Sequence, residues 1–177
     1  CAAAVLERHA RIDILVNAAG WGGIEPYIDN APDTIDRIIA VNLGGPVHLT
    51  QALLPPMIAA SKGRIVNIAS DAGRVGSLGE TVYSAAKGGV IAFTKSLARE
   101  VARYSINVNC VCPGPTATPM LATRPEKLRE AFLKAIPFHR FARPEEIADA
   151  VVFFAVESSV YVTGQILSVS GGLTFAG

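Results

Sequence analysis

The sequence predicts an α/β protein in which helices cover both faces of a doubly wound parallel sheet. Short apolar stretches rich in β-branched residues alternate with longer segments of helical periodicity. The stretches are continuously apolar, which is typical of strands buried on both faces. No repeat, low-complexity tract or linker interrupts the chain, so we expect residues 1–177 to form a single domain.

The elements can be assigned in order. Residues 1–9 have the pattern of a helix end, and Ile12–Asn17 has that of a strand, because this apolar run is too short and too branched for a helix. A helical region is expected from about Pro32 to Ala60, and a second strand at residues 64–69. The first half of the chain therefore has the order helix, strand, helix, strand.

The second half continues this alternation. A long helix is expected from about Val82 to Arg103, because its apolar residues recur on one stripe. The residues of that stripe are Val90, Phe93, Leu97 and Val101. The remaining elements are a strand at Ile106–Cys112, an irregular segment PGPTATPMLATRP, helices at Pro125–Ala135 and Pro144–Phe154, and a strand at Gln165–Val169.

Three candidate site residues follow the ends of predicted strands. Asn17, Ser70 and Pro113 each lie at or just after such an end. Ligands of doubly wound proteins bind beyond the carboxyl ends of the strands. We therefore expect the functional residues to converge on one rim of the sheet.

Composition excludes several classes of function. The chain is 50% hydrophobic with a formal charge of +1, which gives no reason to expect nucleic acid or an anionic membrane as a partner. No apolar run approaches membrane-spanning length, and the first residues lack the features of a signal peptide. A cytoplasmic protein is expected.

The cysteines and histidines do not predict a metal site. Cys1, Cys110 and Cys112 have no metal-type spacing, and the latter two alternate within a strand, as buried thiols in a reducing compartment would. The histidines are scattered and are interpreted as structural or surface residues; they are His9, His48 and His139.

The most informative stretch is SDAGRVGSLGETVYSAAK, which begins at Ser70. If Tyr83 and Lys87 lie on a helix, the four-residue spacing puts both side chains on one face. An ammonium about 4–5 Å from the phenol would lower the tyrosine pKa from about 10 toward about 7. Such a group could exchange protons with an alcohol or ketone whose oxygen Ser70 holds. Tyr-x-x-x-Lys also occurs by chance on many helices, so this pattern gains weight only from its neighbours.

Those neighbours make the chain resemble the short-chain dehydrogenase/reductase family. Its motifs appear in the order and approximate spacing of the family, and they extend to the closing TGQILSVSGG. The motifs are Asn17-Ala18-Ala19-Gly20, Asn42 in IAVNLGG, Ser70, Tyr83-x-x-x-Lys87 and Pro113-Gly114. The resemblance implies a Rossmann-like fold and an oxidoreductase that interconverts a secondary alcohol and a ketone.

The resemblance implies a role for each catalytic candidate. Tyr83 would be the acid/base, Lys87 would lower its pKa and hold the nicotinamide ribose, and Ser70 would position the substrate oxygen. Asn42 would join a proton relay through a water. Its place before two glycines and Pro46 also suits a locally opened helix, whereas taken alone it would be interpreted as a helix-surface amide.

The cofactor contacts implied by the resemblance come from two strand ends and the catalytic helix. NAD or NADP is expected, with NAD favoured. The cofactor-binding candidates are Asn17, Ala18, Gly20, Tyr83, Lys87, Pro113, Gly114, Thr116 and Thr118. A strand-ending turn is the alternative interpretation of the first three and is compatible with the cofactor role, and a proline-rich loop is the alternative interpretation of the last four.

One family motif is absent from residues 1–177. The family opens with a strand and a glycine-rich turn that binds the pyrophosphate. Gly20-Trp21-Gly22-Gly23 does not fit that turn, because Glu25 stands where the third glycine is required and no helix begins directly behind it. We therefore expect the chain to be the C-terminal portion of a longer enzyme that lacks about 75–80 residues. The strand at residues 12–17 would then present a bare apolar edge.

The substrate is constrained by two segments. Trp21 is expected either to wall the substrate pocket or to pack within its loop. Residues 125–132 are amphipathic and occupy the place of a mobile substrate lid in the family. Within the family, the motifs resemble most the dehydrogenases of 2-hydroxycyclohexane-carboxyl-CoA, which implies an alicyclic β-hydroxyacyl thioester. The 3-oxoacyl-carrier-protein reductases are nearly as similar.

A non-catalytic scaffold subunit is an alternative of another class. The long helices could serve association, and the missing phosphate loop favours this interpretation, whereas the intact serine, tyrosine, lysine and asparagine set opposes it. The family resemblance implies a homotetramer or homodimer.

Overall fold

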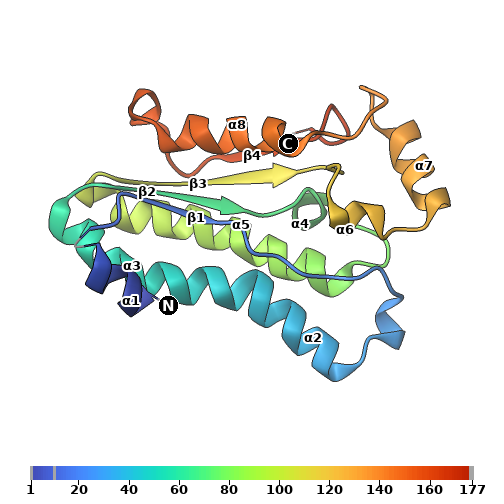
Figure 1. Cartoon of the computed structure of the whole chain (residues 1–177), viewed down its shortest axis with the longest axis horizontal. Helices are drawn as coiled ribbons and strands as arrows, with labels where there is room; N and C mark the ends of the chain where they lie inside the picture. The colour runs from blue at the N-terminus through green and yellow to red at the C-terminus, as the bar shows by residue number, and fades with distance from the viewer. Residues whose placement is uncertain (1, 10, 176–177) are drawn as a thin grey trace.

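The computed structural model describes residues 2–9 and 11–175 and contains a four-stranded parallel sheet (Figure 1). The strands lie in the order of the sequence, β1-β2-β3-β4, and all their carboxyl ends point the same way. Their bounds are β1 Ile14–Asn17, β2 Gly63–Ile68, β3 Ile106–Pro113 and β4 Ile166–Val169. The predicted parallel α/β sheet is confirmed, with each strand end within two residues of its expected position.

Helices cover the two faces of the sheet. In Figure 1, α8 (Pro144–Ala155) lies above the sheet, whereas α3 (Gly45–Ala60) and α5 (Thr81–Val101) lie below it. The short helices α1 (Ala2–Arg8) and α2 (Pro32–Ile39) flank α3. The sheet therefore has helices on both sides, as the continuously apolar strands predict.

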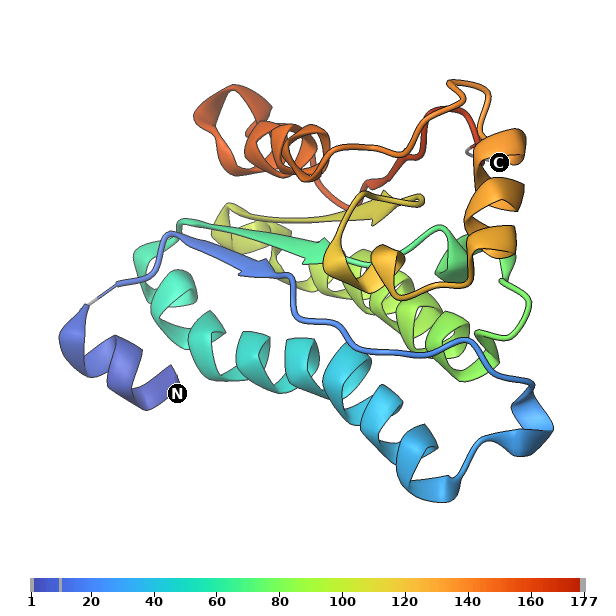
Figure 2. The same ribbon diagram turned by 45° about the vertical axis from the view of Figure 1, so that its right-hand side comes forward.

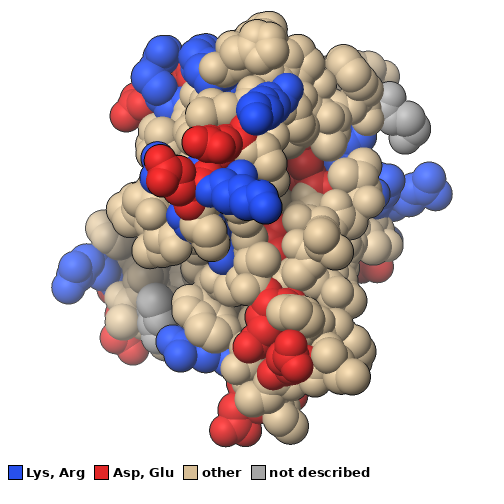
Figure 3. Space-filling model, turned by 90° about the vertical axis from the view of Figure 1, so that its right-hand side faces the viewer, with Lys and Arg blue, Asp and Glu red and all other residues tan. Residues whose placement is uncertain are grey.

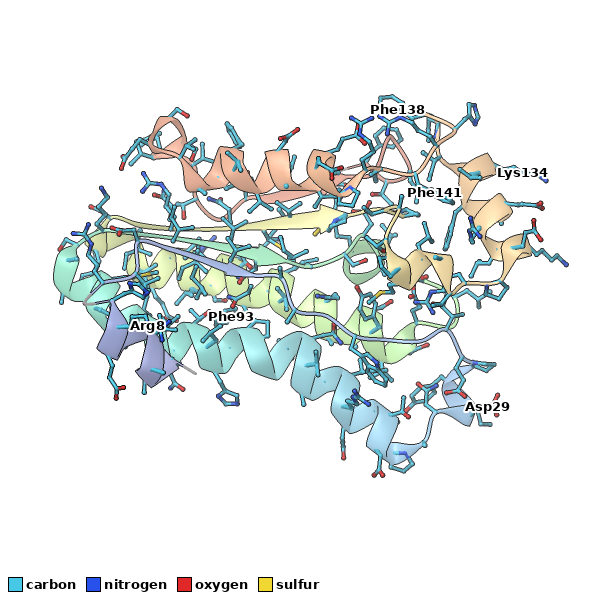
Figure 4. All side chains as sticks on the ribbon, in the orientation of Figure 1. Arg8, Asp29, Phe93, Lys134, Phe138 and Phe141 are labelled. Carbon is cyan, nitrogen blue, oxygen red and sulfur yellow. The ribbon has the colours of Figure 1, made fainter. Side chains whose placement is uncertain are left out.

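The core below the sheet is built from the stripe predicted for the long helix. Val90, Leu97 and Val101 of α5 are buried, and Phe93 lies between α5 and α3 (Figure 4). The strands contribute Ile65 and Val108, both fully buried. α5 and the two central strands thus form one packed body that carries the serine, tyrosine and lysine.

One detail agrees with the sequence-based expectations and two differ from them. The helical region expected from Pro32 to Ala60 is opened at Ala40–Gly44 by a π-helical turn, as expected around Asn42. The segment expected to be irregular contains a short helix, α6 (Pro119–Ala122), followed by α7 (Glu126–Ala135). Short 3₁₀ turns, one of which extends α5, occur at Tyr27–Asp29, Ala102–Tyr104 and Glu157–Ser159.

Strand β1 has the expected apolar edge. Among the described residues it pairs with β2 alone. Ile14 and Val16 are 47% and 40% exposed, whereas Leu15 on the opposite face is buried against α3. This side of the sheet is the least covered by helices (Figure 2).

Within the described residues, no helix is both long enough and apolar enough to cross a membrane.

Candidate active site

A cavity of about 730 Å³ lies at the carboxyl ends of the strands. Its wall comes from the segments after all four strands, from the starts of α5 and α8 and from the α6–α7 segment. The course of these elements can be followed in Figure 2. The volume is in the range of small-molecule sites. Figure 3 views this end of the molecule, where acidic and basic side chains lie side by side and leave no uniformly charged surface.

The predicted serine, tyrosine and lysine all border this cavity. Tyr83 and Lys87 lie one turn apart on α5, and Lys87 Nζ is 5.7 Å from the centre of the Tyr83 ring. Ser70 follows β2, and its Oγ accepts a hydrogen bond of 3.1 Å from the backbone N–H of Ala72. The fold therefore brings together the three groups on which the sequence-based hypothesis depends.

The pKa of Tyr83 does not follow the expectation that Lys87 lowers it. Burial raises the tyrosine pKa above its ordinary value, and the nearby Glu80 carboxylate raises it further. A hydrogen bond from Ser70 and the charge of Arg124 act in the opposite direction but do not compensate. In the described structure, the phenol is therefore held in its protonated form.

Lys87 is itself perturbed by burial. Its side chain is buried, and this lowers its pKa to about 8. The ammonium donates a 2.8 Å hydrogen bond to the carbonyl of Ile68, at the end of β2. An ammonium has three N–H donors, so two are left without a recorded partner among the described residues, and Lys87 borders the cavity.

Asn42 lies in the π-helical turn, which confirms the predicted local opening of the helix. Its Nδ2 donates to the carbonyls of Ile38 at 2.8 Å and Trp21 at 2.6 Å, and its Oδ1 accepts from the Trp21 N–H at 3.2 Å. The side chain is fully buried and does not border the cavity. Asn42 therefore fixes the loop after β1, and the predicted water relay remains a prediction.

Asn17 also lies behind the cavity wall. Its Nδ2 donates to Thr50 Oγ1 at 3.1 Å and to Asn67 Oδ1 at 2.8 Å, and the side chain is buried. Asn67 in turn donates to Thr94 on α5 at 2.9 Å. This buried chain of hydrogen bonds ties β1, β2, α3 and α5 together, which agrees with the expected sheet-stabilising role of Asn17.

The segment after β3 lies along the wall of the cavity, as the sequence predicts. Pro113, Gly114, Thr116 and Thr118 all border it. The Thr116 hydroxyl donates to the Gly114 carbonyl at 3.0 Å, and the Thr118 hydroxyl donates to the Thr116 carbonyl at 3.3 Å and caps α6 by accepting from Leu121 N–H. The segment is pinned by paired backbone hydrogen bonds with Ala142.

The glycines after β1 leave room beside the catalytic candidates. A Cβ on Gly20 would lie 3.6 Å from Lys87 Nζ, and one on Gly22 would lie 3.1 Å from the Tyr83 ring. Both glycines border the cavity together with Ala18. A side chain at either position would crowd Lys87 or Tyr83, so the two glycines keep the cavity side of these residues free of further side-chain atoms.

Trp21 does not wall the pocket. Its side chain packs against Ile38, Val82 and Ala86 and lies outside the cavity wall. The Arg37 guanidinium covers the ring at 4.3 Å from its centre. The packed-loop alternative is therefore correct, because Asn42 turns the backbone of Trp21 toward α2 and α5.

An ion pair and a buried carboxylate at the cavity are not among the features predicted from the sequence. Arg124 Nη2 lies 3.3 Å from Glu80 Oε1, and both side chains border the cavity. Asp71, the neighbour of Ser70, accepts hydrogen bonds of 2.8 Å from Ser168 Oγ to each of its oxygens, and one from Thr174 Oγ1. The position of Glu80 three residues before Tyr83 is the one feature of the sequence that could have indicated a carboxylate near the tyrosine. Nothing in the sequence places Arg124 or Thr174 nearby.

The two described cysteines are free and fully buried, with their Sγ atoms 4.0 Å apart. Cys1 lies outside the described residues. Among the residues that the structure describes, no cluster of His, Cys, Asp or Glu could hold a metal ion.

The fold and the cavity define a class of protein. A parallel α/β sheet that presents a serine, a tyrosine and a lysine beside a cavity at the carboxyl ends of its strands is typical of nicotinamide-dependent oxidoreductases. Sequence comparison identifies the family. The family model described as enoyl-(acyl carrier protein) reductase matches residues 1–174. The chain belongs to the short-chain dehydrogenase/reductase family, whose oxidoreductases act on alcohol and keto groups.

Individual relatives agree with this assignment. A 3-oxoacyl-[acyl-carrier-protein] reductase of Thermotoga maritima is 44% identical over 169 residues, which is 96% of this chain and 69% of that protein. The (3R)-3-hydroxyacyl-CoA dehydrogenase of Rattus norvegicus is 41% identical over 161 residues, or 90% of this chain and 62% of that protein. A crystal structure of 3-oxoacyl-[acyl-carrier protein] reductase from Brucella melitensis superposes with a TM-score of 0.92 at 37% identity, covering 99% of this chain and 68% of that one.

Proposed function

We propose that the protein reduces the keto group of a 3-oxoacyl thioester, and reverses this reaction on the corresponding secondary alcohol. The observation that carries the proposal is that Ser70, Tyr83 and Lys87 border one cavity at the carboxyl ends of the strands. A bound nicotinamide cofactor supplies the hydride in reduction and accepts it in oxidation.

The side chains have separate tasks in this reaction. Ser70 donates a hydrogen bond to the ketone oxygen, and Tyr83 donates its proton to that same oxygen as the carbinol forms. The raised pKa of Tyr83 suits this direction, because the phenol is protonated at neutral pH. Oxidation requires the phenolate, so in that direction the bound cofactor and Lys87 have to lower the pKa from the value in the free protein.

Lys87 holds the cofactor in the proposal. Its two remaining N–H donors face the cavity beside Gly20 and bind the ribose hydroxyls. The backbone around Thr116 borders the nicotinamide end, and Asn17, Ala18, Gly20, Pro113, Gly114 and Thr118 complete the proposed cofactor contacts. Both NAD and NADP remain candidates.

The choice of substrate follows the relatives. Several relatives with about two thirds of their length matched are 3-oxoacyl-[acyl-carrier-protein] reductases, which favours this reading over the alicyclic thioester expected from the motifs. The hydroxyacyl-CoA dehydrogenases among the relatives make a CoA thioester the second candidate. The cavity wall is mainly apolar and includes Ile24, Met120 and Phe132, which suits an acyl chain in either case.

The experiment that tests the proposal begins with cofactor binding. NADH and NADPH are titrated separately into the purified protein, and the fluorescence of the reduced nicotinamide is followed. Reduction of 3-oxobutyryl thioesters of CoA and of acyl carrier protein is then measured by loss of absorbance at the nicotinamide band. Saturable binding with turnover of either thioester supports the function. Binding without turnover of any ketone contradicts it and favours the scaffold alternative.

Two further properties belong to the proposal. We expect the protein to function in the cytoplasm, and we expect a homotetramer or homodimer as the active form. Sedimentation analysis of the purified protein tests the oligomeric state, and a monomer with full activity contradicts it.

A further inference from the structure

The ion pair between Glu80 and Arg124 joins two parts of the cavity wall. Glu80 precedes the first residue of α5, and Arg124 lies between α6 and α7. The distance from Arg124 Nη2 to Glu80 Oε1 is 3.3 Å, and the two side chains are only 13% and 15% exposed. Among the described residues, this is the one hydrogen bond recorded between residues 119–135 and a part of the chain beyond the flanking residues 118 and 136.

The Arg124 guanidinium keeps unused donors. It has five N–H groups and no acceptor, and Glu80 is its one recorded partner within the described residues. Its remaining nitrogens are not sealed in the protein, since none of them is among the fully buried atoms that lack a partner. Because the residue borders the cavity, these donors are available to a molecule bound there.

Arg124 is also close to the reacting centre. Glu80 and Tyr83 are three residues apart at the start of α5, which places their side chains on neighbouring positions of one face. The carboxylate and the guanidinium both act on the charge of the Tyr83 hydroxyl. Arg124 and Tyr83 therefore border the same cavity and lie close enough for the guanidinium to lower the tyrosine pKa.

We propose that Arg124 is a substrate-binding residue that donates hydrogen bonds to the oxygen of a carbonyl group whose carbon is two bonds from the reacting ketone carbon, and that Glu80 positions its guanidinium. A 3-oxoacyl thioester has such an oxygen at its thioester carbonyl. This inference rests on the proposed function, to which it adds the group by which the substrate is recognised.

The balanced charges of Glu80 and Arg124 favour a neutral hydrogen-bond acceptor on the substrate. Glu80 already balances the positive charge of Arg124 in a poorly solvated place. A substrate carboxylate would meet the Glu80 carboxylate at close range, and like charges there are unfavourable. A thioester carbonyl brings no charge. The pair should therefore favour the thioester over the free 3-oxo acid.

The test compares three ketones in the full chain with its cofactor. They are the 3-oxobutyryl thioester of N-acetylcysteamine, free 3-oxobutanoate, and the monoketone 1-decalone, which has no second carbonyl. The variants are R124Q, R124K and E80Q, with K134Q as the control. Lys134 carries the same charge on α7, is exposed, and points away from the rest of the chain (Figure 4).

The expected result is a change in selectivity. Loss of a hydrogen bond from a charged donor lowers the ratio of kcat/KM for the thioester to that for 1-decalone by about 10- to 100-fold in R124Q. R124K retains the charge opposite Glu80 but loses the forked donors, and should lower the same ratio. E80Q should raise the ratio of kcat/KM for free 3-oxobutanoate to kcat/KM for the thioester. K134Q should change none of these ratios.

Two outcomes oppose the inference and are distinguishable. If R124Q and R124K lower kcat/KM for thioester and monoketone by the same factor, Arg124 does not recognise the second carbonyl, and the inference is overturned while the proposed function stands. If the unsubstituted protein binds cofactor but reduces none of the three ketones, the proposed function itself is overturned, and the inference with it.

Discussion

The body formed by β2, β3 and α5 differs sharply from the segment at residues 119–135. Seven of the eight residues of β3 are buried, and α5 buries eight side chains. By contrast, neither α6 nor α7 has a buried residue, and α7 stands apart at the end of the sheet (Figure 1). Ser70, Tyr83 and Lys87 lie on the packed body, whereas Arg124 lies on the loosely packed segment.

In the proposed function, this difference separates the residues for proton transfer, which lie on the packed body, from the residue for substrate binding, which lies on the loosely packed segment. Proton transfer requires groups held to within fractions of an ångström, which a densely packed body provides. A segment with few buried contacts opens at low free-energy cost and can admit a bulky substrate. The following predictions test this division, from the largest expected effect to the smallest.

Replacing Tyr83 by Phe should have the largest effect. The change removes the hydroxyl proposed to act as acid/base but leaves the ring on the packed body, so turnover should fall by about 10²- to 10⁴-fold while the cofactor still binds. Steady-state kinetics and a fluorescence titration of NADH or NADPH measure the two quantities. Turnover that stays within a few-fold of the unsubstituted protein would show that Tyr83 is not the acid/base.

Replacing Lys87 by Met should abolish efficient turnover yet stabilise the cofactor-free fold at pH 7. The lowering of the Lys87 pKa to about 8 shows that its buried charge opposes folding, by up to about 3 kcal/mol. Loss of the hydrogen bond to the Ile68 carbonyl offsets about 1 kcal/mol of this gain.

The sign of the pH dependence follows from the lowered pKa. Below about pH 8, Lys87 is charged in both the folded and the unfolded protein, and its full cost is present. Between about pH 8 and pH 10 the folded protein loses the proton first, so the unsubstituted protein gains stability and the advantage of K87M shrinks. Urea unfolding at pH 7, 8, 9 and 10 measures this difference, and an advantage independent of pH would refute the buried-charge explanation.

The same substitution on α5 and on α7 should affect stability differently. Ala92 and Ala131 are both exposed residues inside helices. A92G should lower the free energy of unfolding by about 1 kcal/mol, because α5 unfolds with the packed body. A131G should lower it by less than about half of that, because α7 can open on its own. Equal losses in chemical denaturation would mean that the two regions unfold as one unit.

The smallest effect concerns the pH profile. Glu80 raises the pKa of Tyr83 and Arg124 lowers it, so E80Q should move the tyrosine limb of the kcat/KM profile to lower pH and R124Q should move it to higher pH. The profile is measured with 1-decalone, which lacks the carbonyl proposed to bind Arg124. Shifts of both variants in the same direction would contradict the assigned charges.

Much of the packed body could be predicted from the sequence. Apolar runs in strands and the stripe on α5 are local patterns, and they gave the strands, the parallel sheet and the convergence of Ser70 and Pro113 on one rim. The opened helix at Asn42 was predictable because the two glycines and Pro46 weaken regular helix locally. These features depend on neighbours in the sequence.

The predictions that were wrong or missing concern properties that depend on residues distant in the sequence. The pKa of Tyr83 is set first by burial, which the spacing of Tyr83 and Lys87 does not reveal. Trp21 turns away from the cavity because Asn42, 21 residues later, binds its backbone. Arg124 reaches Glu80 across 44 residues through an irregular segment whose path no periodicity predicts.

The hydrogen bonds of Asp71 have a consequence for biosynthesis. Asp71 is bonded to Ser168 and Thr174, which lie 97 and 103 residues later in the chain. During translation the Ser70 loop is made long before these hydroxyls leave the ribosome. Until they do, the Asp71 carboxylate lacks the hydrogen bonds that they donate. The wall of the cavity beside Ser70 can be completed only after Thr174 has emerged, and a nascent chain paused earlier would carry Tyr83 and Lys87 beside an unfinished cavity wall.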